Sequence, residues 1–74
     1  MSITVVPTGI LKQYVNGQEA ITLEPGKSIF EMLETLGIPS AMVALALVNG
    51  RQRFKDVVPE EGTTVTLLPL IGGG

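Results

Sequence analysis

One segment of the sequence, Ser28 to Gly37, carries the pattern of a helix with both ends marked. Ser28 and Glu31 have the spacing of a capping box, in which each side chain accepts a hydrogen bond from the other residue's backbone N–H. Gly37 suits the left-handed position that ends a helix, and Pro39 prevents the helix from resuming. The apolar residues between these ends repeat at helical intervals and are Ile29, Met32, Leu33 and Leu36. The sequence therefore predicts one helix over residues 28–36.

Short segments on both sides of this helix are rich in β-branched residues or alternate between two faces, which is typical of strands. After a bend near Pro7, residues 11–15 are expected to resume the first strand. In the segment 43–48, Val43, Leu45 and Leu47 are expected on one face, with Ala44, Ala46 and Val48 on the other. In the segment 64–68, Val65 and Leu67 are expected on one face, with Thr64, Thr66 and Leu68 on the other. The predicted strands are residues 3–5, 11–15, 20–24, 43–48, 51–54 and 64–68.

Two Asn-Gly dipeptides, Asn16-Gly17 and Asn49-Gly50, separate pairs of these strands. Both residues of such a dipeptide tolerate positive φ, which is what a type I′ hairpin turn requires. The sequence thus predicts two hairpins, one on each side of the helix.

A single helix can cover only one face of one sheet. We therefore expect an α+β fold in which a mixed sheet of four to five strands packs on one helix, the β-grasp or ubiquitin-like arrangement. By analogy with that fold, the first and last strands are expected to lie side by side and parallel at the centre of the sheet.

The composition excludes several kinds of chemistry. The 74 residues include no cysteine and no histidine, which removes disulfides, cysteine nucleophiles, histidine bases and nearly all zinc sites. A net charge of −2 argues against nucleic acid as a partner, since phosphate binding needs a basic surface. The longest apolar run, residues 41–48, is far shorter than a membrane span. No secretory signal is apparent, so we expect a cytoplasmic protein with no metal and no membrane association.

Other motifs have simpler explanations. Gly26-Lys27-Ser28 resembles the end of a phosphate-binding loop, but that motif requires a glycine where Ile21 stands. Glu60 and Glu61 fit a solvated turn. The basic cluster of Arg51, Arg53 and Lys55 fits a solvated hairpin edge, with contact to a partner protein as the alternative.

Three glycines, Gly72, Gly73 and Gly74, follow the apolar run from Leu67 to Ile71. Because glycine has no side chain and the widest backbone freedom, such a segment can enter a narrow channel and present its terminal carboxylate there. A frayed end or a leftover linker would explain the same residues. We expect residues 1–69 to form a β-grasp domain and residues 70–74 a flexible tail.

Residues Glu60 to Gly74 resemble the end of the ubiquitin-like sulfur carriers, the family that includes the small subunit of molybdopterin synthase (MoaD) and the thiamine sulfur carrier ThiS. An acidic turn with a glycine, an alternating strand, a proline, apolar residues and terminal glycines follow in the same order. The predicted element order extends the resemblance over nearly the whole chain. The run from Leu67 to Ile71 favours MoaD over ThiS.

The resemblance implies a carrier rather than an enzyme. A ubiquitin-activating-type adenylyltransferase would use ATP to adenylate the carboxylate of Gly74, and a sulfur donor protein would supply the sulfur of a thiocarboxylate. A sulfur acceptor enzyme, either the large subunit of molybdopterin synthase or a thiazole synthase, would receive it. Leu68, Leu70 and Ile71 would bind these partners, and the chain itself would hold no cofactor.

Several alternatives stay open at this point. The family ends in two glycines and this chain in three, so Gly73 is the reactive end if Gly74 is removed. Leu68 is equally compatible with core packing. The activated glycine could instead be joined to lysines of other proteins, as in a ubiquitin-like modifier. A β-grasp interaction module with inert glycines is the remaining possibility.

Overall fold

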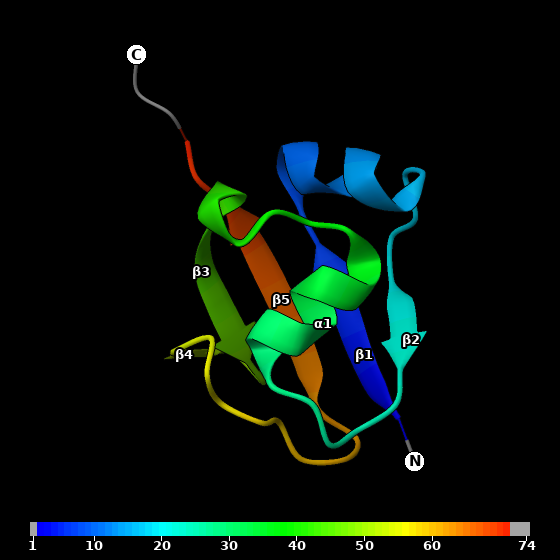
Figure 1. The fold of residues 1–74 in the computed structure, drawn as a ribbon, viewed down its shortest axis with the longest axis vertical. Helices are drawn as coiled ribbons and strands as arrows, with labels where there is room; N and C mark the ends of the chain where they lie inside the picture. Colours follow the sequence, from blue (N-terminus) through cyan, green and yellow to red (C-terminus); the bar gives the residue numbers. More distant parts are fainter. Residues whose placement is uncertain (1, 72–74) are drawn as a thin grey trace.

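A five-stranded mixed sheet carries one α-helix on one of its faces in the computed structural model, which describes residues 2–71 (Figure 1). The strands are β1 (Ile3–Pro7), β2 (Ile21–Leu23), β3 (Val43–Val48), β4 (Arg51–Arg53) and β5 (Thr64–Pro69). The α-helix is α1 (Ile29–Leu36), and two 3₁₀ helices are η1 (Gly9–Val15) and η2 (Ser40–Met42).

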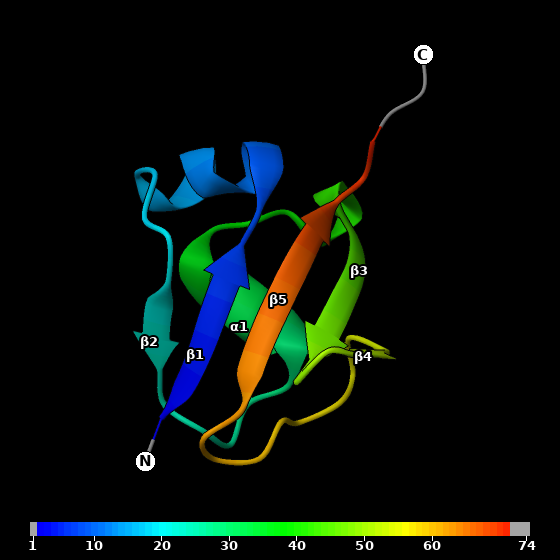
Figure 2. The ribbon, with the colours of Figure 1, turned by 180° about the vertical axis from the view of Figure 1, so that it is seen from behind.

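The strand order across the sheet is β2-β1-β5-β3-β4. β1 and β5 pair in parallel at the centre, and the other three pairs of neighbours are antiparallel. The opposite view shows the sheet in front, with α1 behind it (Figure 2). This arrangement confirms the predicted α+β fold and β-grasp topology, including the parallel pairing of the first and last strands.

The ends of α1 are those that the sequence predicts. The Ser28 N–H donates to Glu31 Oε1 at 2.8 Å, and the Glu31 N–H donates to Ser28 Oγ at 3.2 Å. Gly37 ends the helix in the left-handed conformation, with φ 73°. The segment after β4 satisfies two further amide groups of the helix start. The Ile29 N–H donates to the Val57 carbonyl at 3.0 Å, and the Phe30 N–H donates to the Lys55 carbonyl at 2.9 Å.

The core lies between α1 and the sheet. α1 contributes its buried stripe, and the central strands contribute every second residue, as the alternation of β5 predicts. The buried apolar residues are Ile3, Val5, Leu11, Val15, Ile29, Met32, Leu33, Ile38, Val43, Ala46, Val65 and Leu67. Within residues 2–71, no helix combines the length and apolar character that a bilayer crossing requires.

The prediction that residues 11–15 resume the first strand is wrong, because they form most of η1. Leu11 and Val15 are buried, whereas Gln13 between them is exposed. In a strand these three side chains would share one face, since side chains alternate with a period of two. A helical turn buries the two apolar residues and leaves Gln13 in solvent. The hairpin from β1 to β2 therefore has η1 in its connection.

The predicted alternation of β3 is also wrong at its start. Val43 and Ala46 are both buried, three residues apart, and Ala44 is exposed. The register against β5 shifts between Val43 and Leu45, which leaves Ala44 as the extra residue of a β-bulge. Beyond the bulge, Leu45 and Leu47 lie on the sheet face opposite α1, and Asn49-Gly50 forms the predicted turn into β4.

Candidate functional site

The end of β5 is held closely by the segment that follows β1. The Thr8 backbone N–H and the Thr8 hydroxyl both donate to the Leu67 carbonyl, at 3.1 and 2.8 Å. Gly9 follows with φ +56°, and a Cβ built on it would lie 3.1 Å from Pro69 Cγ. Glycine is therefore required at position 9 both by the backbone conformation and by the close approach of Pro69.

The other side of the same strand end is held through η2. The Leu70 N–H donates to the Met42 carbonyl at 2.8 Å. η2 is in turn tied to the segment after β4, because Lys55 Nζ donates to the Ser40 carbonyl at 2.8 Å and to Ser40 Oγ at 3.2 Å. The backbone is thus fixed on both sides up to Leu70, the first residue of the predicted tail.

Apolar side chains surround this strand end. Leu70 is 52% exposed and Ile71 is 89% exposed. Leu68 is half-buried and lies on the sheet face opposite α1, where Leu45 of β3 is its cross-strand neighbour. Exposed apolar residues that gather at one place are typical of protein interaction sites. We refer to Leu45, Leu68, Leu70 and Ile71 as the exit patch.

The structure brings the predicted partner-binding residues Leu68, Leu70 and Ile71 to one end of the sheet, where η1 and η2 also lie (Figure 1). Leu68 lies on the solvent-facing side of the sheet and not in the core. The predicted reactive and tail residues Gly72, Gly73 and Gly74 lie outside the described residues.

Three contributors to this site were missed at the sequence level. Leu45 joins the exit patch only because the β3–β5 register places it opposite Leu68. Gly9 and Met42 position the strand end through long-range contacts, for which no local pattern exists. The one available signal was Gly9 itself, since a glycine directly after a strand often marks a close approach of backbone.

The titratable side chains of the described residues lie mostly apart from the exit patch. No group of three or more acidic, histidine or cysteine side chains is placed to hold a metal ion within residues 2–71. The pKa of Glu31 is held below its ordinary value of 4.5 by the Ser28 backbone N–H and then by the Ser28 hydroxyl. Both contacts belong to the helix cap.

Residues 9–72 match the Mut7-C ubiquitin family, and this match spans most of the sequence. The chain belongs to the Mut7-C ubiquitin family. The search of curated proteins found no match to this chain.

Solved structures similar to this Mut7-C ubiquitin chain come from an archaeon and a bacterium. SAMP1 from Haloferax volcanii is 17% identical, with both chains covered completely and a TM-score of 0.74. The HVO 2177 protein of Haloferax volcanii is 18% identical over 100% of this chain and 87% of that one, with a TM-score of 0.75.

The third similar structure is a complex of subunits 1 and 2 of the molybdopterin-converting factor from Helicobacter pylori 26695. The matching chain is 19% identical, both chains are covered completely, and the TM-score is 0.63. At these identities the similarity shows a shared β-grasp fold.

Proposed function

We propose that this Mut7-C ubiquitin protein is a cytoplasmic sulfur carrier whose terminal glycine is converted to a thiocarboxylate. The observation that carries the proposal is the geometry of the exit patch. The strand end is hydrogen-bonded as far as Leu70, apolar side chains lie exposed around it, and the chain then continues into three glycines. Membership of a ubiquitin-like family and the fold shared with a molybdopterin-converting factor subunit support the same role.

The chemistry takes place on the carboxylate of Gly74. A carboxylate is a poor electrophile, and an activating enzyme overcomes this by transferring AMP from ATP to the carboxylate oxygen, with release of pyrophosphate. The outer sulfur of a persulfide on the donor protein then attacks the acyl carbon, and AMP leaves with that oxygen. A thiol reductant next cleaves the S–S bond that joins the two proteins and keeps the donor's inner sulfur as a disulfide. The product is an anionic thiocarboxylate, which is nucleophilic at neutral pH.

The folded domain serves recognition rather than catalysis in this proposal. Leu70 and Ile71 contact the walls of each partner's channel, while Leu68 and Leu45 provide an apolar surface at its entrance. The hydrogen bonds of Leu67 and Leu70 hold the strand end that each partner recognises. Glycines without side chains then allow successive active sites to close around the same segment.

The partners follow from this chemistry. They are a ubiquitin-activating-type adenylyltransferase that uses ATP, a sulfur donor protein and a sulfur acceptor enzyme. We favour a large subunit of molybdopterin synthase as the acceptor, and hence molybdenum or tungsten cofactor synthesis, because the similar Helicobacter pylori structure is a complex of two molybdopterin-converting factor subunits. A thiazole synthase is the alternative acceptor.

The direct test is the intact mass of the protein after incubation with ATP, an activating enzyme and a sulfur donor. Replacement of one carboxylate oxygen by sulfur adds about 16 Da to the acyl end. Deletion of Gly73 and Gly74 is expected to abolish the change, with the unfolding curve unaltered. Deletion of Gly74 alone tests whether Gly73 is a competent reactive end.

The same experiment separates the other functions. Covalent ladders with other proteins would instead identify a modifier, and no change in mass under any condition would identify an inert interaction module. A truncated chain that still accepted sulfur would contradict the assignment of the terminal glycine.

The exit patch has its own test within this reaction. Ile71→Asp is expected to lower kcat/KM for adenylation by at least about tenfold, because it places a charge in the predicted apolar contact. Val58→Asp is the matched control, since Val58 is 53% exposed but lies in the connection between β4 and β5. Equal losses in the two variants would contradict a specific role for the patch.

A further inference from the structure

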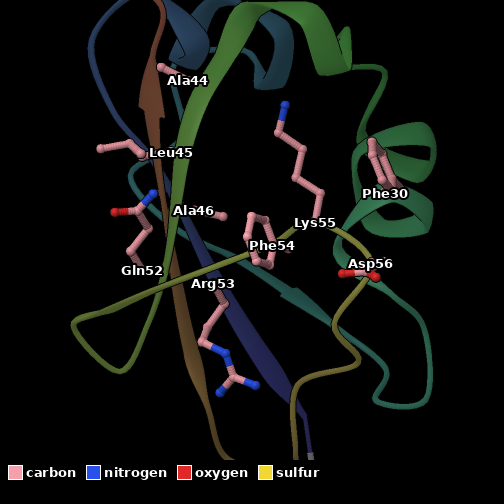
Figure 3. Close-up of a pocket in the computed structure, with 9 residues that line it drawn as sticks. All are labelled: Phe30, Ala44, Leu45, Ala46, Gln52, Arg53, Phe54, Lys55 and Asp56. Atoms are coloured by element: carbon pink, nitrogen blue, oxygen red, sulfur yellow. The ribbon is translucent and has the colours of Figure 1, made fainter.

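A second exposed apolar site lies between α1 and the hairpin strands β3 and β4. It is a groove with a volume of about 470 Å³, lined by the segment from Gln52 to Asp56, the start of β3 and Phe30 of α1 (Figure 3). Phe54 is 83% exposed and Phe30 is 47% exposed. These are the two phenylalanines of the chain, and both face solvent instead of the core.

The groove runs beside an open strand edge. β4 pairs with β3 only from Ala46 to Val48, so the first half of β3 has a neighbouring strand on the β5 side alone. Ala44, the bulge residue, is exposed there and lines the groove. An open edge of this kind accepts an extended peptide as an additional strand, and the adjacent groove accepts one of its side chains.

The groove is positively charged in a chain that is negative overall. Arg53 and Lys55 line it against a single carboxylate, Asp56, and Arg51 stands at the start of β4. The hydrogen-bond acceptors of Lys55 are the uncharged carbonyl and hydroxyl of Ser40, so its charge is not neutralised. Within residues 2–71, no salt bridge involves Arg51 or Arg53.

Lys55 also shapes the groove. Its side chain crosses the space between β3 and α1, and Nζ lies 6.0 Å from the centre of the Phe30 ring (Figure 3). This distance is at the limit of a cation–π contact. The lysine stem and the two aromatic rings together provide an apolar floor with positive charge at its rim.

We propose that this groove binds an extended acidic segment of a partner protein, one that presents a large apolar side chain between carboxylates. The apolar side chain would lie between Phe54 and Phe30, the carboxylates would face Arg53 and Arg51, and the backbone would run beside Ala44. The groove shares Leu45 with the exit patch but none of its other residues, and its binding does not depend on the reactivity of the terminal glycine.

The test uses the full chain and a capped synthetic peptide, Ile-Val-Ile between two pairs of aspartates, followed by amide NMR shifts. Saturable shifts are expected at Ala44, Leu45, Arg53 and Phe54, with weaker binding at higher salt. Phe54→Ser and Arg53→Glu are expected to raise the dissociation constant at least about fivefold. Phe54 is exposed, so its replacement leaves the fold intact.

Two matched controls separate the groove from general surface effects. Val58→Ser removes another exposed apolar residue, and Lys27→Glu makes the same charge change at an exposed site on the loop before α1; both are expected to bind the peptide normally. A peptide with lysine in place of aspartate is expected not to bind.

Four results would overturn the proposal. They are the absence of saturable shifts, shifts centred on residues outside the groove, equal binding of the lysine peptide, and concentration-dependent shifts of the groove residues without peptide. The last result would assign the groove to a second copy of the chain. Sulfur acceptance by Phe54→Ser is expected to be unchanged, so this proposal and the proposed carrier function fail independently.

Discussion

The tripeptide Val-Asn-Gly occurs twice, at residues 15–17 and 48–50, and the two copies end different structures. In the first, Asn16 ends the 3₁₀ helix η1 with φ 56°. In the second, Asn49 and Gly50, with φ 49° and 85°, form the two-residue turn between β3 and β4. The tripeptide favours a left-handed asparagine in both places. The residues before it decide what that asparagine terminates.

The two copies also lie at opposite ends of the sheet (Figures 1 and 2). The first belongs to η1, whose first residue, Gly9, packs against Pro69 beside the exit patch. The second stands at the far end of β3, where the Asn49 N–H binds the Thr64 carbonyl at the start of β5. The first copy therefore ends an element whose other end contacts the candidate site, whereas the second copy belongs to a strand pairing.

The largest expected effect comes from truncating a buried apolar side chain of η1, the element that the first copy ends. Leu11 of η1 is completely buried, and Leu11→Ala is expected to lower the free energy of unfolding by about 3 kcal/mol through lost burial and an unfilled cavity. Leu47→Ala, at a half-buried position just before the second copy, is expected to cost about 1 kcal/mol. Urea unfolding measures both. Equal costs would contradict packing as the origin of η1.

An intermediate effect compares the two asparagines directly. Alanine tolerates the left-handed conformation less well than asparagine does. We therefore expect Asn16→Ala to lower the free energy of unfolding by about 1 kcal/mol. Asn49→Ala is expected to cost about 1 kcal/mol more, because Asn49 Oδ1 also accepts a hydrogen bond from the Thr64 N–H at 3.0 Å. Thermal or urea unfolding measures the free energy of unfolding of both variants. Equal losses in the two variants would contradict the added hydrogen bond of Asn49.

The smallest effect uses α1 as a reference, because its ends follow from local sequence alone. The pKa of Glu31 is lowered in the folded protein, so its ionised form adds stability above the ordinary value of 4.5. That contribution is lost as the pH falls through the lowered pKa. We expect Glu31→Gln to have a flatter dependence of unfolding free energy on pH below about pH 5 than the parent protein. Parallel pH profiles would argue against the capping interaction.

Most of the features that sequence reasoning predicted correctly depend on neighbours along the chain; the parallel pairing of β1 and β5 was predicted by analogy with the β-grasp fold. Ser28 and Gly37 mark the ends of α1, Asn49-Gly50 marks the β3–β4 turn, and the alternation of Val65 and Leu67 marks the buried face of β5. Each signal links residues no more than a few positions apart. The fold class followed because one amphipathic helix among several strands permits few arrangements.

The features that sequence reasoning missed depend on distant partners. Residues 11–15 have strand-like composition, yet a helical turn buries Leu11 and Val15 together. The Ala44 bulge arises because β3 must keep both Val43 and Ala46 against the core while pairing with β5. Sequence reasoning named Leu68, Leu70 and Ile71 as partner-binding residues, which stays a prediction, and it did not name their structural neighbours Leu45 and Met42.

The sequence alone determined where α1 begins and ends, most of the segments that become strands, and that an apolar run leads into glycines. Only the tertiary structure decided the register of β5 against β3, the hydrogen bond between Leu70 and Met42, and the open groove lined by two phenylalanines. The physical reason is the distance along the chain over which each kind of interaction acts. Capping, turn conformation and side-chain periodicity act within a few residues, whereas register and close backbone approach are fixed by contacts between segments far apart in the chain.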